Sequence, residues 1–220
     1  MINTLEIDSV RKQYDYKNIL SDVYLKISRG EIIGLLGRNG SGKSTLLKII
    51  FGIVPADFKF ILINGKIVSK TSESLKHISY LDQNSFIPNY FSVQKAVSLS
   101  IPKDSIAHFY VDALIQQIKN SKISQLSGGE LKYLELKLVL QNESKFVLLD
   151  EPYSGLAPIM YGKVNLLIQQ NASKKGIIVT DHNYEEILKT ATRIVLLKNG
   201  KTISIQNKDE LVEFGYLNGL

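Results

Sequence analysis

Apolar and polar positions follow two different periods along this chain. Alternation with a period of two predicts strands, a continuous apolar run predicts a buried strand, and apolar residues three and four apart predict helices. In the first third these patterns predict strands at LEIDSV (5–10), VYLKIS (23–28), EIIGLLG (31–37) and HISYLD (77–82), a helix at KSTLLKIIFG (43–52), and a hairpin at FKFILINGKI (58–67) that turns at Asn64-Gly65.

The middle of the chain, about residues 85–145, has a different pattern. Helical spacing recurs there without an intervening strand pattern, in SVQKAVSLSI (92–101), SIAHFYVDALIQQI (105–118) and ELKYLELKLVLQN (130–142). Alternation of strands and helices then resumes with FVLLDE (146–151), a helix near 158–170, GIIVTD (176–181), a helix near 183–190, RIVLLKNG (193–200), KTISIQ (201–206) and a last helix after Asn207. These patterns predict an α/β fold with a mostly parallel sheet and an inserted helical lobe.

Composition narrows the class of protein. A chain of 220 residues with 44% apolar and 22% charged residues suits one soluble domain. It has no cysteine, which excludes disulfides and thiolate metal sites. Its apolar runs are too short to cross a bilayer, and its first residues do not resemble a secretion signal. The net charge of +6 comes from scattered lysines and not from a basic stripe, so no nucleic-acid partner is expected.

A phosphate-binding loop is predicted at residues 37–44, GRNGSGKS, which fits the pattern G-x-x-x-x-G-K-[ST] between an apolar strand and a helix. Gly37, Gly40 and Gly42 let the backbone close around phosphates, and the positive end of the helix dipole favours an anion there. The Lys43 amine can reach the β and γ phosphates, and the Ser44 hydroxyl can ligate Mg²⁺. The nucleotide-binding residues predicted here also include Arg38, Asn39, Ser41 and Thr45.

Two adjacent acids, Asp150 and Glu151, end the apolar strand FVLLDE. Ligands of parallel sheets bind at the carboxyl ends of strands. We expect Asp150 to hold Mg²⁺ and Glu151 to orient or deprotonate the attacking water. Because neighbouring strand residues point to opposite faces, the two acids can have different roles.

The segment LSGGE (126–130) places two glycines at the mouth of a predicted helix, where each costs about 1 kcal/mol relative to alanine in a helix interior. Ser127 and Glu130 have the spacing of a capping box, so one interpretation is a simple helix start. The other is that Gly128 and Gly129 admit a large anion close to the backbone.

In this order GRNGSGKST, LSGGE and VLLDE resemble the ATP-binding cassette (ABC) ATPases over essentially the whole chain. The resemblance implies a P-loop NTPase core with an antiparallel β subdomain. It further implies that residues 1–220 form one domain, with residues 1–84 and 146–220 as the core and about 85–145 as the helical subdomain. Ser127, Gly128, Gly129 and Glu130 would then contact the γ-phosphate of ATP bound to a second subunit, most simply in a homodimer.

The resemblance also assigns smaller motifs. Gln83, in YLDQNSFIP, matches the Q-loop, which senses Mg²⁺ and the γ-phosphate, and His182, in TDH, matches the switch histidine. Tyr14 lies where the family places an aromatic that stacks on adenine, with Tyr16 as a rival. In the segment PYSGLAPI (152–159), Ala157 stands where the family usually has an aspartate, which puts one contact between subunits in doubt.

The implied function is the ATP-binding and ATP-hydrolysing subunit of an ABC transporter, with ATP and Mg²⁺ as cofactors. It would power solute or lipid translocation through membrane subunits on separate chains. These subunits would hold it at the cytoplasmic side of the cell membrane. PYSGLAPI together with TDHN is similar to the cassettes of lipopolysaccharide export and branched-chain amino-acid import. The alternatives are a soluble single-cassette ATPase, acting for example in cofactor assembly, and a binding module that has lost hydrolysis.

Overall fold

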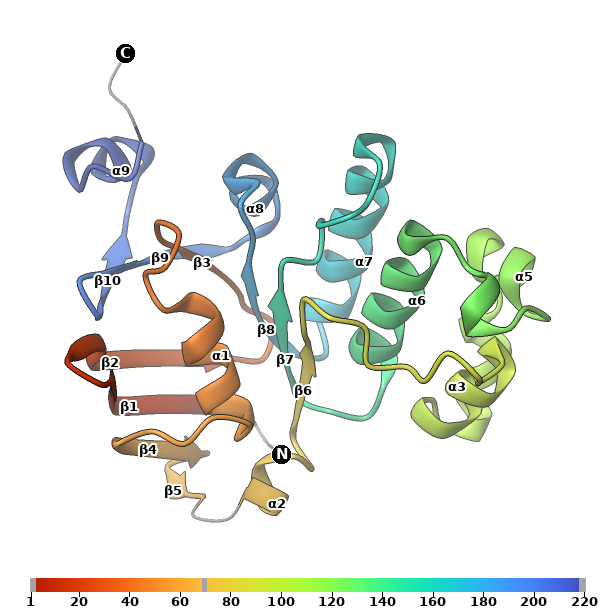
Figure 1. The fold of residues 1–220 in the computed structure, drawn as a ribbon, viewed down its shortest axis with the longest axis horizontal. Helices are drawn as coiled ribbons and strands as arrows, with labels where there is room; N and C mark the ends of the chain where they lie inside the picture. The colour runs from red at the N-terminus through yellow and green to blue at the C-terminus, as the bar shows by residue number, and fades with distance from the viewer. Residues whose placement is uncertain (1–2, 69–70, 218–220) are drawn as a thin grey trace.

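The computed structural model describes residues 3–68 and 71–217 as a curled mixed sheet with helices on both of its faces (Figure 1). The strands follow the sequence patterns closely. They are β1 (Thr4–Tyr14), β2 (Lys17–Ser28), β3 (Ile32–Leu36), β4 (Phe58–Ile63), β5 (Lys66–Ile67), β6 (Ile78–Leu81), β7 (Phe146–Asp150), β8 (Gly176–Thr180), β9 (Arg193–Lys198) and β10 (Lys201–Ile205).

The sheet order β5-β4-β1-β2-β10-β9-β3-β8-β7-β6 joins two kinds of pairing. Strands β9, β3, β8, β7 and β6 are parallel, so their carboxyl ends meet at one edge. Strands β1, β2, β4 and β5 pair antiparallel, and the expected hairpin turns at Asn64-Gly65 between β4 and β5. The predicted fold class, a mostly parallel core with an antiparallel β part, is confirmed.

The inner parallel strands divide their side chains between two hydrophobic cores. In β7, Val147 and Leu149 face one core, while Phe146 and Leu148 face the other. The second core also contains Leu46 and its neighbours on helix α1 (Lys43–Phe51), together with residues of β1 and β2. Burial on both faces explains why these strands are apolar without interruption.

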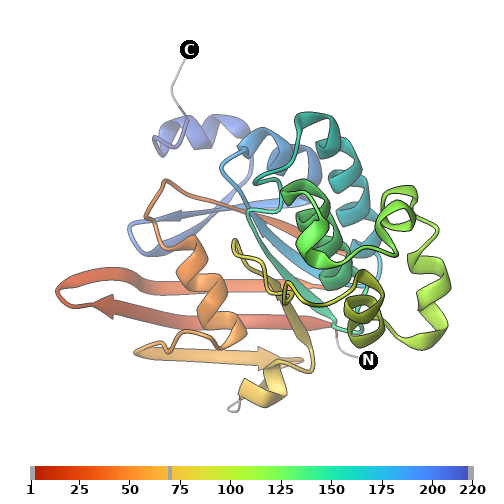
Figure 2. The same cartoon turned by 45° about the vertical axis from the view of Figure 1, so that its right-hand side comes forward.

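The described residues form eight further helices besides α1. They are α2 (Thr71–Ser74), α3 (Val93–Ser100), α4 (Ile106–Phe109), α5 (Ala113–Ile118), α6 (Gly128–Gln141), α7 (Tyr161–Ala172), α8 (Tyr184–Thr190) and α9 (Lys208–Glu213), with single 3-10 turns at Lys103–Ser105, Ile123–Gln125 and Pro158–Met160. Helices α3 to α6 form a lobe beside the sheet (Figure 2). No strand is assigned within residues 85–145, as the spacing predicts. The outermost residues of the expected domain, 1–2 and 218–220, lie outside the described residues.

One sequence prediction in this lobe needs refinement. Residues 105–118 have continuous helical spacing, yet the structure divides them into α4 and α5. The break falls at Asp112, whose side chain accepts hydrogen bonds from the backbone N–H groups of Leu114 and Ile115 at 3.0 and 3.4 Å. An acid that caps a new helix stabilises a helix start and therefore competes with a continuous helix.

Asp112 also connects the helical lobe to the sheet-bearing core. Its carboxylate accepts from the Tyr133 hydroxyl at 2.6 Å and the Lys137 amine at 3.2 Å, both on α6, and from the Lys163 amine on α7 at 2.9 Å. Burial alone would raise the pKa of Asp112, but these hydrogen bonds outweigh it and hold that pKa well below its usual value. The ionised carboxylate thus stabilises the junction of three helices.

Replacing Asp112 by Asn should lower the free energy of unfolding by about 2 kcal/mol at pH 7, since charged hydrogen bonds are lost. Because the folded pKa is depressed, this stabilisation is complete above the unfolded pKa of about 3.9 and disappears as the pH falls through the folded pKa. The difference between wild type and variant should therefore shrink below about pH 4. Urea titrations across this range measure it, with the exposed Asp104→Asn as control. A difference that is constant with pH would contradict the role of the charge.

Candidate active site

The predicted phosphate-binding loop forms a tight turn between β3 and α1. Gly42, directly before α1, has φ 102°, a conformation that favours glycine. A Cβ on Gly37 would lie 2.5 Å from the Ser41 Oγ and 2.7 Å from the Leu197 carbonyl, so only glycine fits there. The Ser41 Oγ is buried and has no hydrogen-bond partner in the described part of the chain. A narrow cradle with an unsatisfied polar atom fits a phosphate group.

Lys43 begins α1 and turns back over this loop. Its amine donates hydrogen bonds to the carbonyl of Gly37 at 2.7 Å and to that of Arg38 at 3.3 Å. Burial lowers the pKa of Lys43, while the carboxylates of Asp150, Glu151 and Asp181 oppose that shift. A buried ammonium held by neutral carbonyls can move to a phosphate with a net gain in charge pairing.

Asp150, at the carboxyl end of β7, meets Ser44 as the sequence predicts. Its Oδ1 accepts from the Ser44 hydroxyl at 3.0 Å, and its Oδ2 accepts from the Tyr80 hydroxyl at 3.0 Å. Burial raises the pKa of Asp150, the two hydrogen bonds lower it, and the nearby Glu151 raises it further. A hydroxyl and a carboxylate in contact are hard oxygen ligands, and Mg²⁺ usually binds one or two carboxylates plus phosphate oxygens. These residues therefore fit Mg²⁺.

Glu151 and His182 come together from the ends of β7 and β8. The Glu151 Oε1 lies 2.6 Å from the His182 Nε2. Glu151 has φ 53°, which is unusual for a residue with a side chain and is typical of functional positions. Its N–H donates to the Thr180 carbonyl at 2.8 Å, so β8 fixes this turn. Because of this turn, Glu151 contacts His182 while Asp150 contacts Ser44, so the two acids do have different surroundings.

Sequence reasoning missed two residues here. Tyr80, on β6, holds Asp150, but its partner lies on the neighbouring strand, so no local pattern reveals the contact. Asp181 is buried and accepts from the N–H groups of Tyr153 and Asn183 at 3.0 and 2.9 Å. Asp181 thereby connects the loop after Glu151 to the loop of His182, and its position after the apolar strand GIIVT was the available signal.

The LSGGE segment starts α6 with a complete capping box. The Ser127 hydroxyl accepts from the Glu130 N–H at 3.3 Å, and the Glu130 carboxylate accepts from the Ser127 N–H at 2.8 Å. An added Cβ on Gly128 would meet nothing within 4 Å in the described chain, and one on Gly129 would make only ordinary contacts. The capping prediction is confirmed, and packing within this chain does not explain the glycines.

Three further predicted residues, Gln83, Thr45 and Tyr14, lie outside the contacts described above. Gln83 is exposed in the loop after β6, and Thr45 is partly buried in α1. Tyr14 ends β1 with 45% of its surface exposed, whereas Tyr16 is fully exposed at the tip of the β1–β2 hairpin. The Lys12 amine lies 4.8 Å from the centre of the Tyr14 ring. Tyr14 is thus the less exposed of the two aromatics, and its contact with adenine stays a prediction.

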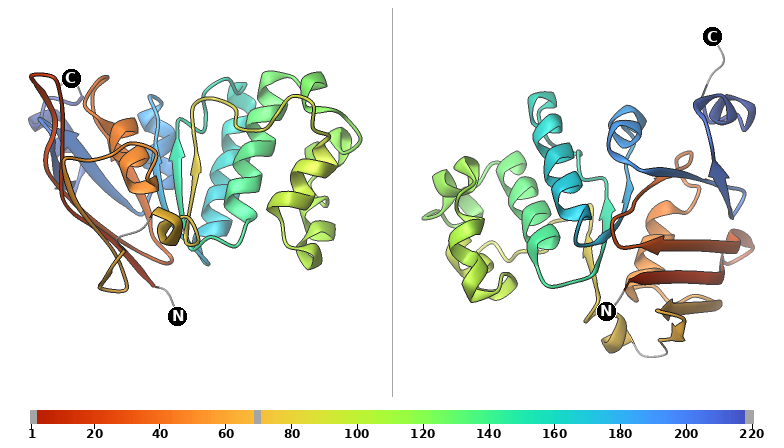
Figure 3. Two further views of the ribbon diagram at one scale, coloured as in Figure 1. Left: turned by 60° about the horizontal axis from the view of Figure 1, so that its bottom comes forward. Right: turned by 180° about the vertical axis from the view of Figure 1, so that it is seen from behind.

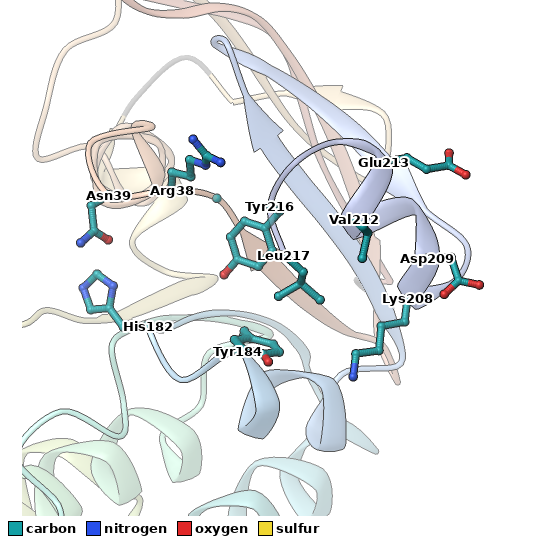
Figure 4. Close-up of a pocket in the computed structure, with 11 residues that line it drawn as sticks. Arg38, Asn39, His182, Tyr184, Lys208, Asp209, Val212, Glu213, Tyr216 and Leu217 are labelled. Carbon is teal, nitrogen blue, oxygen red and sulfur yellow. The ribbon is translucent and has the colours of Figure 1, made fainter. Parts of the chain in front are cut away.

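Two cavities flank the exposed turn of Arg38 and Asn39. One, of about 430 Å³, lies between this turn and Lys17–Ile19 of β2. The other, of about 1020 Å³, separates the turn from α9, with His182 beside Asn39 at one end and the Tyr216 ring between Arg38 and α9 (Figure 4). The Arg38 guanidinium donates to the Gly215 carbonyl at 2.6 Å, so the segment after α9 contacts this loop.

Comparison with known proteins decides the family. The family model described as ABC transporter matches residues 20–154. This chain belongs to the ABC transporter family. It is 30% identical to the lipopolysaccharide export system ATP-binding protein LptB of Escherichia coli K12, over 96% of this chain and 93% of that protein. It is also 30% identical to a probable ABC transporter ATP-binding protein of Azorhizobium caulinodans, over 91% of this chain and 76% of that protein.

Solved structures agree on the fold. The structure of an ATP-binding subunit of an ABC transporter superposes with a TM-score of 0.85 at 21% identity, over 100% of this chain and 95% of that one. A bacterial Atm1-family ABC exporter with ATP bound gives 0.84 at 19% identity, over 100% of this chain and 41% of that one. At these identities the likeness concerns the fold alone.

These findings confirm the family, the fold class and the enzyme class, an ATP hydrolase, that the motifs predict. They also favour a transporter subunit over a soluble ABC ATPase with another role. None of the helices in residues 3–68 and 71–217 has the length and apolar character that a bilayer crossing requires. The roles of the individual site residues stay predictions.

Proposed function

We propose that this protein hydrolyses ATP as a head-to-tail homodimer docked on separate membrane subunits, at the cytoplasmic side of the membrane, and so powers the movement of a solute or lipid. One observation carries the proposal. The ends of β3, β7 and β8 bring the Lys43 loop, the Asp150–Ser44 pair and the Glu151–His182 pair to one edge of the sheet. Lipids are included in the cargo class because a relative at 30% identity acts in lipopolysaccharide export.

Each residue has a distinct part in this mechanism. Lys43 and the loop amides bind the β and γ phosphates and offset their charge. Ser44, Asp150 and Gln83 would hold Mg²⁺, which would neutralise phosphate charge when bound. Glu151 accepts the proton of the attacking water, and His182 holds the Glu151 carboxylate in place through their 2.6 Å contact. Tyr14 would stack on the adenine ring.

The need for a second copy rests on where LSGGE lies. Helix α6, which begins at Gly128, and helix α1, which begins at the phosphate-binding loop, lie on opposite sides of β6 and β7 in two different views (Figures 1 and 3). The open space around Gly128 leaves its backbone accessible from outside the protomer. A phosphate bound to the facing protomer would occupy that space, and the amides at the start of α6 favour an anion.

The complete set of Lys43, Asp150, Glu151 and His182 argues against a binding module without hydrolysis. Ala157, in place of the family's usual aspartate, lies outside this set. It is exposed and precedes the turn Pro158–Met160, where it makes no side-chain cap. The proposed catalytic set within one protomer is therefore complete without position 157.

The dimer makes a direct prediction. In a Glu151→Gln background, Ser127→Arg should abolish ATP-dependent dimerisation, since a long cation would fill the space reserved for the facing phosphate. Size-exclusion chromatography with and without ATP measures the dimer. Ser124→Arg, at an exposed position just before LSGGE, adds the same side chain as a control and should leave the dimer intact. A dimer peak that survives Ser127→Arg would refute contact through this segment.

The membrane partner is tested by purification from the native membrane. A tagged copy of the protein should retain a polytopic membrane protein in mild detergent. Retention of only soluble scaffold proteins would instead favour the assembly-factor alternative.

A further inference from the structure

The loop that carries Gln83 is bound to α6 on both sides of that residue. Before Gln83, the Lys132 amine donates to the Asp82 carbonyl at 3.0 Å. After it, the Glu135 Oε1 accepts from the Ser85 hydroxyl at 2.6 Å and from the N–H groups of Phe86 and Ile87 at 2.9 and 3.4 Å. Two side chains of one helix thus fix the loop backbone at two points.

Both of these side chains are buried charges. Glu135 is 1% exposed and Lys132 is 8% exposed, and their spacing of three puts them on one face of α6. Burial lowers the pKa of Lys132, and the Glu135 carboxylate is the strongest opposing influence. A buried carboxylate is costly unless it is hydrogen-bonded. The hydroxyl and N–H groups of the loop therefore stabilise Glu135, and Glu135 in turn fixes their position.

The same loop is tied to the helix of the phosphate-binding loop. The Asp82 carboxylate lies 3.6 Å from the amine of Lys48 on α1. Gln83 therefore sits between two helices, and each of them begins at one of the two proposed nucleotide-contacting segments. The Gln83 side chain itself is exposed, and so is 48% of Phe86, so the contacts fix the backbone and leave these side chains available.

We propose that Lys132 and Glu135 are positioning residues that lock the Gln83 loop to α6, so that any movement of the LSGGE helix start carries Gln83 with it. The inference rests on the proposed function, because it matters for catalysis only if Gln83 and LSGGE both meet ATP. A buried charge that served packing alone would not need to bind Ser85, Phe86 and Ile87, three consecutive residues of this loop.

The test compares the buried carboxylate of Glu135 with the part-buried carboxylate of Asp112, each of which accepts from two backbone N–H groups. Glu135 accepts from Phe86 and Ile87, and Asp112, which caps α5, accepts from Leu114 and Ile115. Hydrogen exchange of the nucleotide-free protein reports both pairs. Glu135→Ala should speed exchange at Phe86 and Ile87 by about tenfold or more, the effect of losing a charged hydrogen bond, and leave Leu114 and Ile115 unchanged. Asp112→Ala should do the reverse.

Kinetics separate positioning from simple destabilisation. Glu135→Ala should lower kcat for ATP by about tenfold or more, as misplacement of a catalytic group does, with KM within about twofold. Glu135→Gln keeps an acceptor oxygen and should recover part of both the exchange protection and kcat, which gives a second readout if the alanine variant folds poorly. Lys132→Met should change exchange and kcat in the same direction as Glu135→Ala, but by less.

Two results would overturn the inference. One is unchanged exchange at Phe86 and Ile87 in Glu135→Ala, and the other is an equal fall of kcat in Glu135→Ala and Asp112→Ala. The exchange experiment needs no nucleotide, so it tests the lock even if the wild-type protein fails to hydrolyse ATP. That failure would refute the proposed function, and it would leave the lock as a structural feature without a catalytic part.

Discussion

Replacing Glu151 by Gln should reduce ATP turnover by about 100-fold or more, the usual effect of losing a general base. The amide cannot take the proton of the attacking water. It keeps the size of the side chain and can still contact the His182 Nε2, which now lies 2.6 Å from Glu151. ATP binding should therefore persist, because Lys43 and the loop amides are unchanged. Phosphate release measures turnover, and equilibrium titration with ATP measures affinity.

The matched control for this variant lies at the other end of the same strand. Glu143 is exposed and precedes β7, whereas Glu151 follows it. Glu143→Gln makes the same chemical change far from the phosphate-binding loop and should leave turnover within about twofold, as surface substitutions usually do. Turnover of Glu151→Gln close to that of wild type would remove Glu151 from the role of base.

Replacing Lys43 by Ala should weaken nucleotide affinity by about 10- to 100-fold, since a charged contact contributes about 1.5–3 kcal/mol and each 1.4 kcal/mol is tenfold. The buried amine now rests on the Gly37 carbonyl at 2.7 Å and would exchange this contact for phosphate oxygens. Calorimetric titration with a non-hydrolysable ATP analogue and Mg²⁺ measures the loss.

Removing Lys43 also leaves a buried carbonyl without its donor, so stability needs its own control. Lys59, on β4, donates to the Ile49 carbonyl near the end of α1 at 2.9 Å, and burial lowers its pKa as it does that of Lys43. Lys59→Ala should cost similar stability in urea titrations and leave nucleotide affinity unchanged. Equal loss of affinity in both variants, or none in Lys43→Ala, would contradict the phosphate cradle.

Local patterns were sufficient for most of the fold. Strand β7 could be predicted because both of its faces are buried, which makes its first four positions, FVLL, apolar before Asp150. The start of α6 could be predicted because Ser127 and Glu130 satisfy each other within one helical turn. Residues 105–118 show the limit of periodicity, since the apolar spacing continues through Asp112, whereas α4 ends at Phe109 and the Asp112 cap starts α5.

Some residues of the candidate site could likewise be predicted from local patterns, and others could not. Lys43, Ser44 and Asp150 were found from sequence because each lies at a fixed place relative to an apolar strand or a glycine turn. Tyr80 and Glu135 were missed because their partners are distant in sequence, as in the contact of Tyr80 with Asp150 or of Glu135 with Phe86. Such partners follow from strand order and helix docking, which no short segment encodes.

The sequence by itself determined the motifs of the phosphate-binding loop, the acids at the end of β7 and the capped start of α6, because each depends on residues within a few positions of one another. Only the tertiary structure decided that Glu151 meets His182, that Asp150 is held from two sides, and that α6 binds the loop around Gln83. These contacts depend on which strands lie side by side and on the way α6 packs against the sheet, and both are set by burial of side chains from the whole chain.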